Sequence, residues 1–266
     1  MNINRIQLIS NNTLKSQKAE ETVKQHVEHF GMEIVDDNPD LIIAIGGDGA
    51  FIQAVHKTDF NKDVYYVGIH TGHLGFLQEV NVDNINRMIE MIHHKNYRID
   101  KVSVEAVTVY TESRQDKFLS LNEVTVREKD LRTMYFDVLV NNRCLERFAG
   151  DGINISTSLG STAYNLSLGG SIMYQEMNCL QLMPIAPINS SAYKSLRCGV
   201  IVPENMVVSI IPNEGYEDKV LISVDGMKRE YDEKVQKIET TTSVSGINIL
   251  RFDQYDFWTR VNEKLL

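Results

Sequence analysis

The stretch LIIAIGGDGAFIQAVHKT (residues 41–58) decides the fold class of this chain. Its first five residues are all apolar, and a continuous apolar run of this length suits a strand that is covered on both faces, as in a parallel sheet. Glycines then surround the single carboxylate of Asp48, and a helix is predicted from about Ala50 to Lys57. The stretch therefore predicts a strand, a glycine-rich turn and a helix in direct succession.

The same alternation of strand and helix continues through the first hundred residues. Strands are predicted at 3–10 and 64–70, and helices at 13–30 and 82–94. The second of these helices has its apolar residues spaced to lie on one face. We therefore expect an α/β N-terminal domain over residues 1–100, with an open, mostly parallel sheet.

After Lys101 the sequence changes to an alternation of apolar and polar residues with period two, which is typical of strands with one buried face. Turn signals between such runs are Asn141-Asn142 and Asp225-Gly226, because these residue types tolerate positive φ. A β-rich domain is therefore predicted over residues 101–251. The last stretch, about 252–266, is predicted to be one amphipathic helix.

Composition and charge narrow the classes of function. The chain has 266 residues and a formal net charge of -9, which argues against general nucleic-acid binding but not against a phosphate-bearing small molecule. Cys144, Cys179 and Cys198 are far apart without metal-type spacing, and the histidines form no convincing ligand set. No targeting segment is recognised, and no apolar run approaches membrane-spanning length. We expect a cytoplasmic protein with no metal-ligand cluster, no nucleic-acid partner and no membrane partner.

The glycine-rich turn suits the binding of an anion. Backbone N–H groups at a helix N-terminus, together with the helix dipole, favour a phosphate, and glycine lets its oxygens approach. Gly46, Gly47 and Gly49 are therefore candidate phosphate-binding residues. Asp48 has two interpretations: it takes a hydroxyl proton or holds magnesium, or it simply caps the following helix. The octapeptide AIGGDGAF (44–51) does not decide between them.

Three further stretches contain candidate ligand contacts. HTGHLGFL (70–77) follows a predicted strand with a glycine-rich turn, and LNEVTV (121–126) interrupts a strand with two adjacent polar residues. The run at 148–170 is rich in glycine and hydroxyl groups, and its Tyr164 suits stacking on a base. The alternative is an ordinary loop or exposed strand position in each case, although a loop of about twenty residues inside a compact domain favours a functional role.

Taken together, these stretches resemble the bacterial NAD kinase family. The resemblance extends over most of the chain and rests on GGDGA (46–50), HTGHLGFL (70–77), LNE (121–123), GDGINIST (150–157), GSTAYNLS (160–167) and PIAPIN (184–189). It implies a Rossmann- or phosphofructokinase-like α/β domain, a β-rich β-sandwich domain, and a final helix that packs back on the first domain. It also implies that ATP or another phosphoryl donor, with magnesium, phosphorylates the adenosine-ribose 2′-hydroxyl of NAD to give NADP. A homo-oligomer, dimer or tetramer, is expected on the same basis.

The resemblance implies roles for individual residues as well. Asp48 is the catalytic residue, as general base or orienting group for the 2′-hydroxyl. Asn122 and Glu123 hold adenosine or ribose hydroxyls, and Asp151 and Ala186 lie near the nicotinamide end. The full set of residues expected to bind NAD is Asp48, Gly49, Phe76, Asn122, Glu123, Asp151, Thr162, Ala163, Tyr164, Asn165, Ser167, Ala186 and Asp225.

Some positions depart from the usual motifs of the family. Ala50 stands where threonine is usual, Ser158-Leu159 where Pro-Thr or Pro-Ser is usual, and Ala149 where some relatives have arginine. A lost hydrogen bond to a charged group costs about 1.5–3 kcal/mol, so a rate lower by roughly ten- to hundredfold is compatible with Ala50. The alternatives are a non-catalytic NAD(P)-binding regulator and a lipid or diacylglycerol kinase with a GGDG loop. The acidic charge argues against the lipid kinase, and Asp48 favours an active enzyme.

Overall fold

The computed structural model describes residues 3–73, 75–191, 193–252 and 255–266, and the side chains of 243–245 lie outside this description. Leu74 of the predicted glycine-rich turn and residues 253–254 of the predicted final helix therefore lie outside the described residues. No helix within the described ranges is long and apolar enough to cross a membrane.

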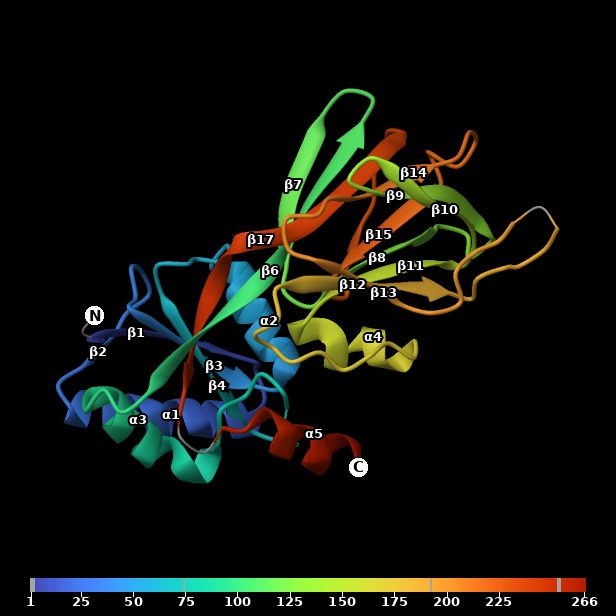
Figure 1. Cartoon of the computed structure of the whole chain (residues 1–266). Coiled ribbons are helices and arrows are strands. Elements are labelled where there is room, and N and C mark those ends of the chain that lie inside the picture. The colour runs from blue at the N-terminus through green and yellow to red at the C-terminus, as the bar shows by residue number, and fades with distance from the viewer. Residues whose placement is uncertain (1–2, 74, 192, 253–254) are drawn as a thin grey trace. The chain divides into compact units, whose positions relative to one another are not determined.

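The chain divides into two compact units. One is made of Met1–Val102 and Gly246–Leu266, and the other of Ser103–Ser245. The strands β6 (Arg98–Thr111) and β17 (Val235–Arg251) pass from one unit into the other (Figure 1). The unit boundaries therefore fall inside strands rather than in linkers.

The first unit is built on a parallel sheet. Its strands are β1 (Arg5–Ser10), β2 (Glu33–Ile34), β3 (Leu41–Gly46), β4 (Tyr65–His70) and β5 (Val80–Asn81). The order is β2-β1-β3-β4, these strands pair in parallel, and the far end of β17 also pairs with β4 in parallel. β3 is buried at every position, which explains its continuous apolar sequence. The predicted open parallel sheet is confirmed.

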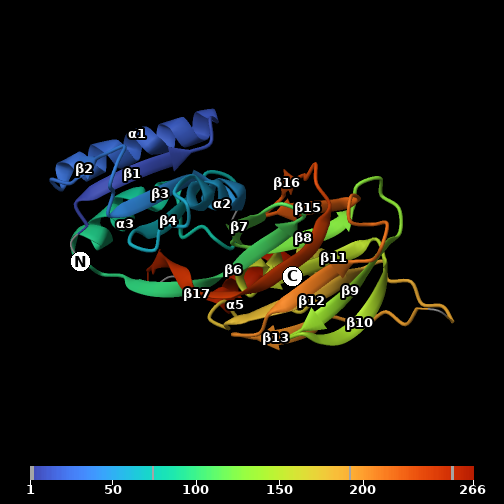
Figure 2. The same cartoon turned by 90° about the horizontal axis from the view of Figure 1, so that it is seen from above.

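Helices cover both faces of this sheet. In the described part of the chain they are α1 (Leu14–His29), α2 (Asp48–Lys57) and α3 (Ile85–His93), the last preceded by a 3₁₀ turn. α1 and α3 pack together and share a hydrophobic cluster with the sheet, and α2 packs against β3 and β4 (Figure 1). Figure 2 shows α1 running alongside β1 and β2. The connection after β1 leads to β2 on one side, and the connection after β3 leads to β4 on the other. The topological switch point of the sheet therefore lies between β1 and β3, and open α/β sheets bind ligands at such points.

The second unit is β-rich. One antiparallel sheet has the order β13 (Val200–Pro203), β12 (Cys179–Ile185), β11 (Gly152–Thr157), β8 (Glu123–Glu128), β15 (Val220–Val224) and β16 (Met227–Arg229). Another places β10 (Arg143–Gly150), β9 (Met134–Val140), β14 (Val208–Pro212) and β17 side by side. A hydrophobic cluster with Val124 and Ile153 from the first sheet and Phe136 and Phe148 from the second forms the core. The fold predicted from the sequence, an α/β unit followed by a two-sheet β-rich unit, is confirmed.

The remaining elements of this unit are short. They are β7 (Gln115–Ser120), the 3₁₀ helix η2 (Leu159–Thr162) and α4 (Tyr164–Ser167). Both predicted turns are confirmed. Asn141 and Asn142, with φ of 48° and 62°, join β9 to β10, and Asp225 and Gly226, with φ of 48° and 80°, join β15 to β16.

Two helices begin at other residues than the sequence predicts, because their caps lie elsewhere. α5 (Phe257–Leu265) begins after residue 252, where Asp256 caps it by accepting a hydrogen bond from the Thr259 N–H at 2.7 Å. α2 begins at Asp48 rather than at Ala50, because Gly47 is its N-cap residue.

Candidate active site

The glycine loop between β3 and α2 has two kinds of glycine. Gly46 has a φ of 150°, and a Cβ atom built on it lies only 2.6 Å from Ala50 Cβ, so a side chain is not tolerated there. Built Cβ atoms on Gly47 and Gly49 meet no atom within 4 Å. The loop is therefore closed on its Gly46 side and leaves free space beside the two glycines that flank Asp48.

Asp48 is the first residue of α2 and does not cap it. Its Oδ2 accepts from the Phe76 N–H at 3.0 Å, and its Oδ1 accepts from the Leu77 N–H at 3.0 Å. Lys264 Nζ lies 3.2 Å from Oδ2. Of the two interpretations open at the sequence level, the helix cap is wrong, because the carboxylate is directed to another loop.

The loop that holds Asp48 is the glycine-rich turn after β4. A Cβ atom built on Gly75 lies 1.9 Å from Asp48 Oδ1, so only glycine allows the backbone to pass this close to the carboxylate. Gln78, which is fully buried, donates from Nε2 to the Gly47 carbonyl at 2.8 Å. The two loops are thus joined by side-chain to backbone bonds in both directions. Sequence reasoning identified the turn but not Gln78.

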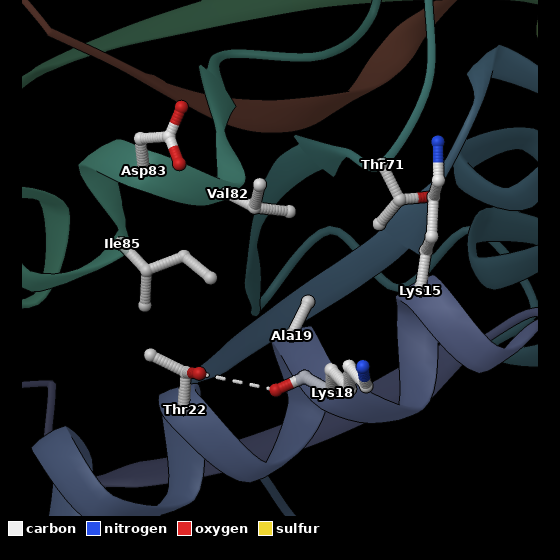
Figure 3. A pocket seen from close by; sticks show the side chains of 8 residues that line it. All are labelled: Lys15, Lys18, Ala19, Thr22, Thr71, Val82, Asp83 and Ile85. Atoms are coloured by element: carbon white, nitrogen blue, oxygen red, sulfur yellow. Dashed lines mark hydrogen bonds between the residues drawn. The ribbon is translucent and has the colours of Figure 1, made fainter.

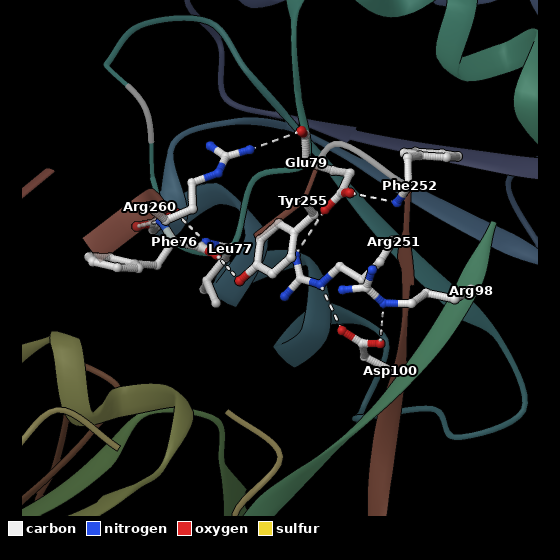
Figure 4. A network of polar contacts seen from close by, with 10 residues as sticks. Phe76, Leu77, Glu79, Arg98, Asp100, Arg251, Phe252, Tyr255 and Arg260 are labelled. Carbon is white, nitrogen blue, oxygen red and sulfur yellow. Dashed lines mark hydrogen bonds and ion pairs between the residues drawn. The ribbon is translucent and has the colours of Figure 1, made fainter. Parts of the chain in front are cut away.

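A buried ion cluster fixes the segment that follows (Figure 4). Glu79 Oε2 lies 3.0 Å from Arg251 Nη1, and Glu79 Oε1 accepts from the Phe252 N–H at 2.7 Å. Burial raises the pKa of Glu79, and the neighbouring Arg251 guanidinium opposes this rise. Arg260 of α5 donates from Nη2 to the Glu79 carbonyl at 3.1 Å. The cluster therefore ties the C-terminal helix to the backbone that holds Asp48.

A cavity lies between α1 and the segments that follow β4 and β5 (Figure 3). It has a volume of about 440 Å³ and is lined by Lys15, Lys18, Ala19, Thr22, Thr71, Val82, Asp83 and Ile85. Lys15 and Lys18 lie in the first turns of α1, and Thr71 follows the last residue of β4. The cavity thus lies at the carboxyl end of the parallel strands. Sequence reasoning did not select any of these residues.

In the second unit, Asp225 organises the start of β8. Its Oδ1 accepts from Ser120 Oγ at 2.8 Å and from the Asn122 N–H at 2.7 Å, and its Oδ2 accepts from the Leu121 N–H at 2.8 Å. The Glu123 N–H also donates to Oδ1, at 3.2 Å. The structure therefore brings together three residues of the predicted site, with the Asp225 carboxylate holding the backbone of the other two.

Glu123 lies in an unusual electrostatic environment. Burial, and next the carboxylate of Asp225, raise its pKa to about 7, and the N–H of Tyr164 opposes the rise. Glu105, which interacts electrostatically with Glu123, is fully buried, and one of its oxygens accepts from Thr240 Oγ1. Burial raises the pKa of Glu105 well above the ordinary range. The sequence contains no signal for Glu105, because the alternation of apolar and polar residues around it is that of any strand.

The hydroxyl-rich run packs directly on this strand end. A Cβ atom built on Gly160 lies 2.1 Å from the Asn122 carbonyl oxygen, and Thr157 Oγ1 donates to the Leu121 carbonyl at 2.7 Å. Asn165 is fully buried, and its Nδ2 donates to the carbonyls of Ser161 at 3.2 Å and Ser171 at 3.3 Å. Asn165 thus holds the loop itself.

The other predicted residues of this run are partly accessible. Thr162, Ala163 and Tyr164 are half-buried, and Ser167 is exposed. Unlike the enclosed Asn165, these four residues have surface that a ligand can reach.

Asp151 and Ala186 form a separate group. Both are exposed and flank the paired ends of β11 and β12, where the Asp151 N–H donates to the Ile185 carbonyl at 2.9 Å. Ala186 has a φ of 45°, a left-handed conformation that is rare for alanine. Asp151 precedes β11 and Gly160 follows it, so the six-residue strand separates the two groups by roughly 20 Å. Phe76, the remaining predicted residue, is 3% exposed and lies in the loop that holds Asp48.

Comparisons with known proteins agree with this organisation. The model of the ATP-NAD kinase N-terminal domain matches residues 3–97, and that of the ATP-NAD kinase C-terminal domain matches residues 121–252. The chain is 38% identical to the NAD kinase of Finegoldia magna, over 98% of this chain and 97% of the relative. It is 30% identical to NAD kinase 1 of Oceanobacillus iheyensis, over 97% of each.

Solved structures show the same fold. A yeast NADH kinase complexed with NADH superimposes with a TM-score of 0.88 at 18% identity, over 100% of this chain and 88% of that one. An NAD kinase from Archaeoglobus fulgidus in complex with ATP superimposes with a TM-score of 0.75 at 20% identity, over 98% and 96%. The resemblance inferred from the motifs is thereby confirmed: this chain belongs to the NAD kinase family.

Proposed function

We propose that this chain transfers the γ-phosphoryl group of ATP to the 2′-hydroxyl of the adenosine ribose of NAD, and so produces NADP. The observation that carries the proposal is Asp48, a carboxylate fixed by two backbone N–H donors and flanked by Gly47 and Gly49, which have free space beside them. A carboxylate held this way has a defined direction before any substrate binds. This is what orientation of a secondary alcohol requires.

In the proposed reaction, Asp48 accepts the proton of the 2′-hydroxyl. The acceptor oxygen forms a bond to the γ-phosphorus, the bond from this phosphorus to the β,γ-bridging oxygen breaks, and ADP leaves with the electron pair. Backbone N–H groups at the N-terminus of α2, next to Gly47 and Gly49, favour the negative charge of the phosphates. Lys15 and Lys18 of the neighbouring cavity offer further positive charge to the donor.

Magnesium fits this arrangement as an ion carried by the donor. Among the described residues, no group of three or more His, Cys, Asp or Glu is placed to hold a metal ion. Magnesium usually keeps its waters and is bound by substrate phosphates with one or two carboxylates, so no protein cage is needed. The glycine loop with Asp48 would hold the ion through those phosphates. When bound, magnesium neutralises the charge that develops on them.

The acceptor dinucleotide is proposed to lie on the second unit. Asn122 and Glu123 take the adenosine or ribose hydroxyls, and Asp225 keeps them in place through the backbone contacts described above. The accessible residues Thr162, Ala163, Tyr164 and Ser167 contact the adenosine, and Asp151 with Ala186 contacts the nicotinamide end. Asn165 is proposed to act indirectly, by shaping the loop, and Phe76 by donating its N–H to Asp48.

We also propose a homo-oligomer, dimer or tetramer, on the basis of the family resemblance. Size-exclusion chromatography with light scattering gives the mass directly. A cytoplasmic location is proposed because the cysteines Cys144, Cys179 and Cys198 are free thiols, as is usual in a reducing compartment.

The test is NADP formation from NAD, ATP and magnesium by the purified protein, read out with an NADP-specific dehydrogenase. Asp48→Asn keeps the size of the side chain but removes its charge and the base, and it replaces one acceptor oxygen by an NH2 group that cannot accept from a backbone N–H. We expect turnover by the wild type and a kcat lower by about 10²–10⁴-fold in the variant. An Asp48→Asn variant as fast as the wild type refutes the role of Asp48.

The alternatives predict other outcomes of the same assay. A non-catalytic regulator gives no NADP with ATP, polyphosphate or the Ala50→Thr variant, while NAD still raises the melting temperature. A lipid kinase phosphorylates diacylglycerol in mixed micelles and not NAD. Inclusion of NADH as acceptor shows which redox form is preferred.

A further inference from the structure

The last turn of α5 brings a lysine to the carboxylate of Asp48. Lys264 Nζ lies 3.2 Å from Asp48 Oδ2, and the same ammonium lies 4.6 Å from the centroid of the Phe76 ring. The two residues of this ion pair are 216 positions apart in the sequence. Their side chains are 34% and 28% exposed, so a ligand can reach the pair.

The helix that carries Lys264 is held by buried groups. Phe257 is 4% exposed, and its ring centroid lies 6.4 Å from that of Phe76. Arg260, one turn before Lys264, donates to the Glu79 carbonyl. Because the segment 76–79 also supplies the N–H donors to Asp48, the lysine and the carboxylate are fixed to the same piece of backbone.

The ammonium adds a third polar contact to the Asp48 carboxylate. Among the described donors, the Phe76 N–H and Lys264 contact Oδ2, and the Leu77 N–H contacts Oδ1. The backbone of Gly75 also lies against Oδ1, since a Cβ atom built on this glycine is 1.9 Å from that oxygen. The carboxylate is therefore held on both oxygens, and without the ammonium Oδ2 keeps only one of its two donors.

We propose that Lys264 is a positioning residue for phosphoryl transfer: its ammonium on Oδ2 fixes the direction in which the Asp48 carboxylate faces the acceptor hydroxyl. The inference rests on the proposed role of Asp48 as the group that takes the hydroxyl proton. A carboxylate that turns from this direction leaves NAD bound but does not hold the hydroxyl in line with the donor phosphorus, so the loss falls on kcat and not on KM. Because both side chains are partly in water, the loss is about three- to tenfold.

The experiment compares Lys264→Met and Lys264→Arg with the wild type in the NADP-forming assay, at saturating ATP and magnesium. Lys62→Met is the matched control, because it removes one exposed lysine from a loop of the same unit. We expect Lys264→Met to lower kcat about three- to tenfold with the KM for NAD within about twofold of the wild type. Lys264→Arg, which keeps a cation at this place, retains at least about half of kcat, and Lys62→Met is unchanged.

Other outcomes overturn the inference. If kcat of Lys264→Met stays within about twofold of the wild type, the ammonium does not position the hydroxyl. If the KM for NAD rises while kcat is unchanged, Lys264 binds substrate instead. If Lys264→Arg loses as much as Lys264→Met, the positive charge is not what matters. Asp48→Asn separates this inference from the proposed function. If Asp48→Asn has no turnover while Lys264→Met is as fast as the wild type, only the role of Lys264 is refuted.

Discussion

Gly75 is predicted to be essential for the rate of the reaction, although it carries no functional group. In the wild type its backbone passes so close to Asp48 that an added Cβ lies 1.9 Å from Oδ1 and 2.5 Å from Cγ. A Cβ needs at least 3.0 Å from such an atom, so Gly75→Ala moves the carboxylate or its N–H donors by about 1 Å. A misplacement of this size costs a catalytic group about hundredfold in rate.

The assay is steady-state NADP formation, with thermal melting as a check on the fold. Gly72→Ala is the matched control, because a Cβ atom built on this glycine of the same turn meets no atom within 4 Å. We expect Gly75→Ala to lower kcat about hundredfold and Gly72→Ala to stay within about twofold. If Gly75→Ala retains more than about a third of the wild-type kcat, the close contact is not what fixes Asp48.

Two further predictions concern buried carboxylates. Glu79→Gln removes one of the two carboxylates that pair with the buried Arg251, the other being Asp100, and lowers the free energy of unfolding by about 1.5–3 kcal/mol, measured by urea denaturation; a loss below about 0.5 kcal/mol contradicts this. For Glu123, burial and the Asp225 carboxylate raise the pKa from 4.5 to about 7, so the folded state holds this proton more tightly than the unfolded chain. Its contribution to stability is therefore full below about pH 4.5 and is lost as pH rises towards 7. Between these two pH values the free energy of unfolding of the wild type falls by up to roughly 3 kcal/mol relative to that of Glu123→Gln. If the plots of unfolding free energy against pH are parallel for the two proteins, the pKa of Glu123 is not raised.

The parts of the site that the sequence predicted are those with a local signal. The glycine loop was recognisable because an apolar run, a glycine cluster and a helix follow one another in residues 41–57. The turns at Asn141-Asn142 and Asp225-Gly226 were recognisable because positive φ favours these residue types. The family resemblance then placed Asn122, Glu123 and the hydroxyl-rich run in one ligand site, and the structure packs these stretches of the second unit together.

The neighbours of each charged group had no such signal. Whether Asp48 caps its helix or points to another loop depends on the position of Phe76 and Leu77, which are far along the chain. Likewise, an aspartate after a strand looks the same in sequence whether its carboxylate faces solvent or, as in Asp225, accepts from the backbone of a distant strand end. The helices α2 and α5 begin at other residues than predicted for the same reason, because the local backbone geometry places their N-caps at Gly47 and Asp256.

The sequence by itself determined the order of strands and helices, the glycine positions of the loop between β3 and α2 and the family of the protein, because periodicity, φ preference and motif spacing are local properties. Only the tertiary structure decided that Lys264 lies on Asp48, that Gly75 must be bare beside it, and that Glu79 and Arg251 form a buried pair. These contacts join residues that the chain separates widely, and the energy of a charge depends on its burial and its neighbours, which packing alone sets.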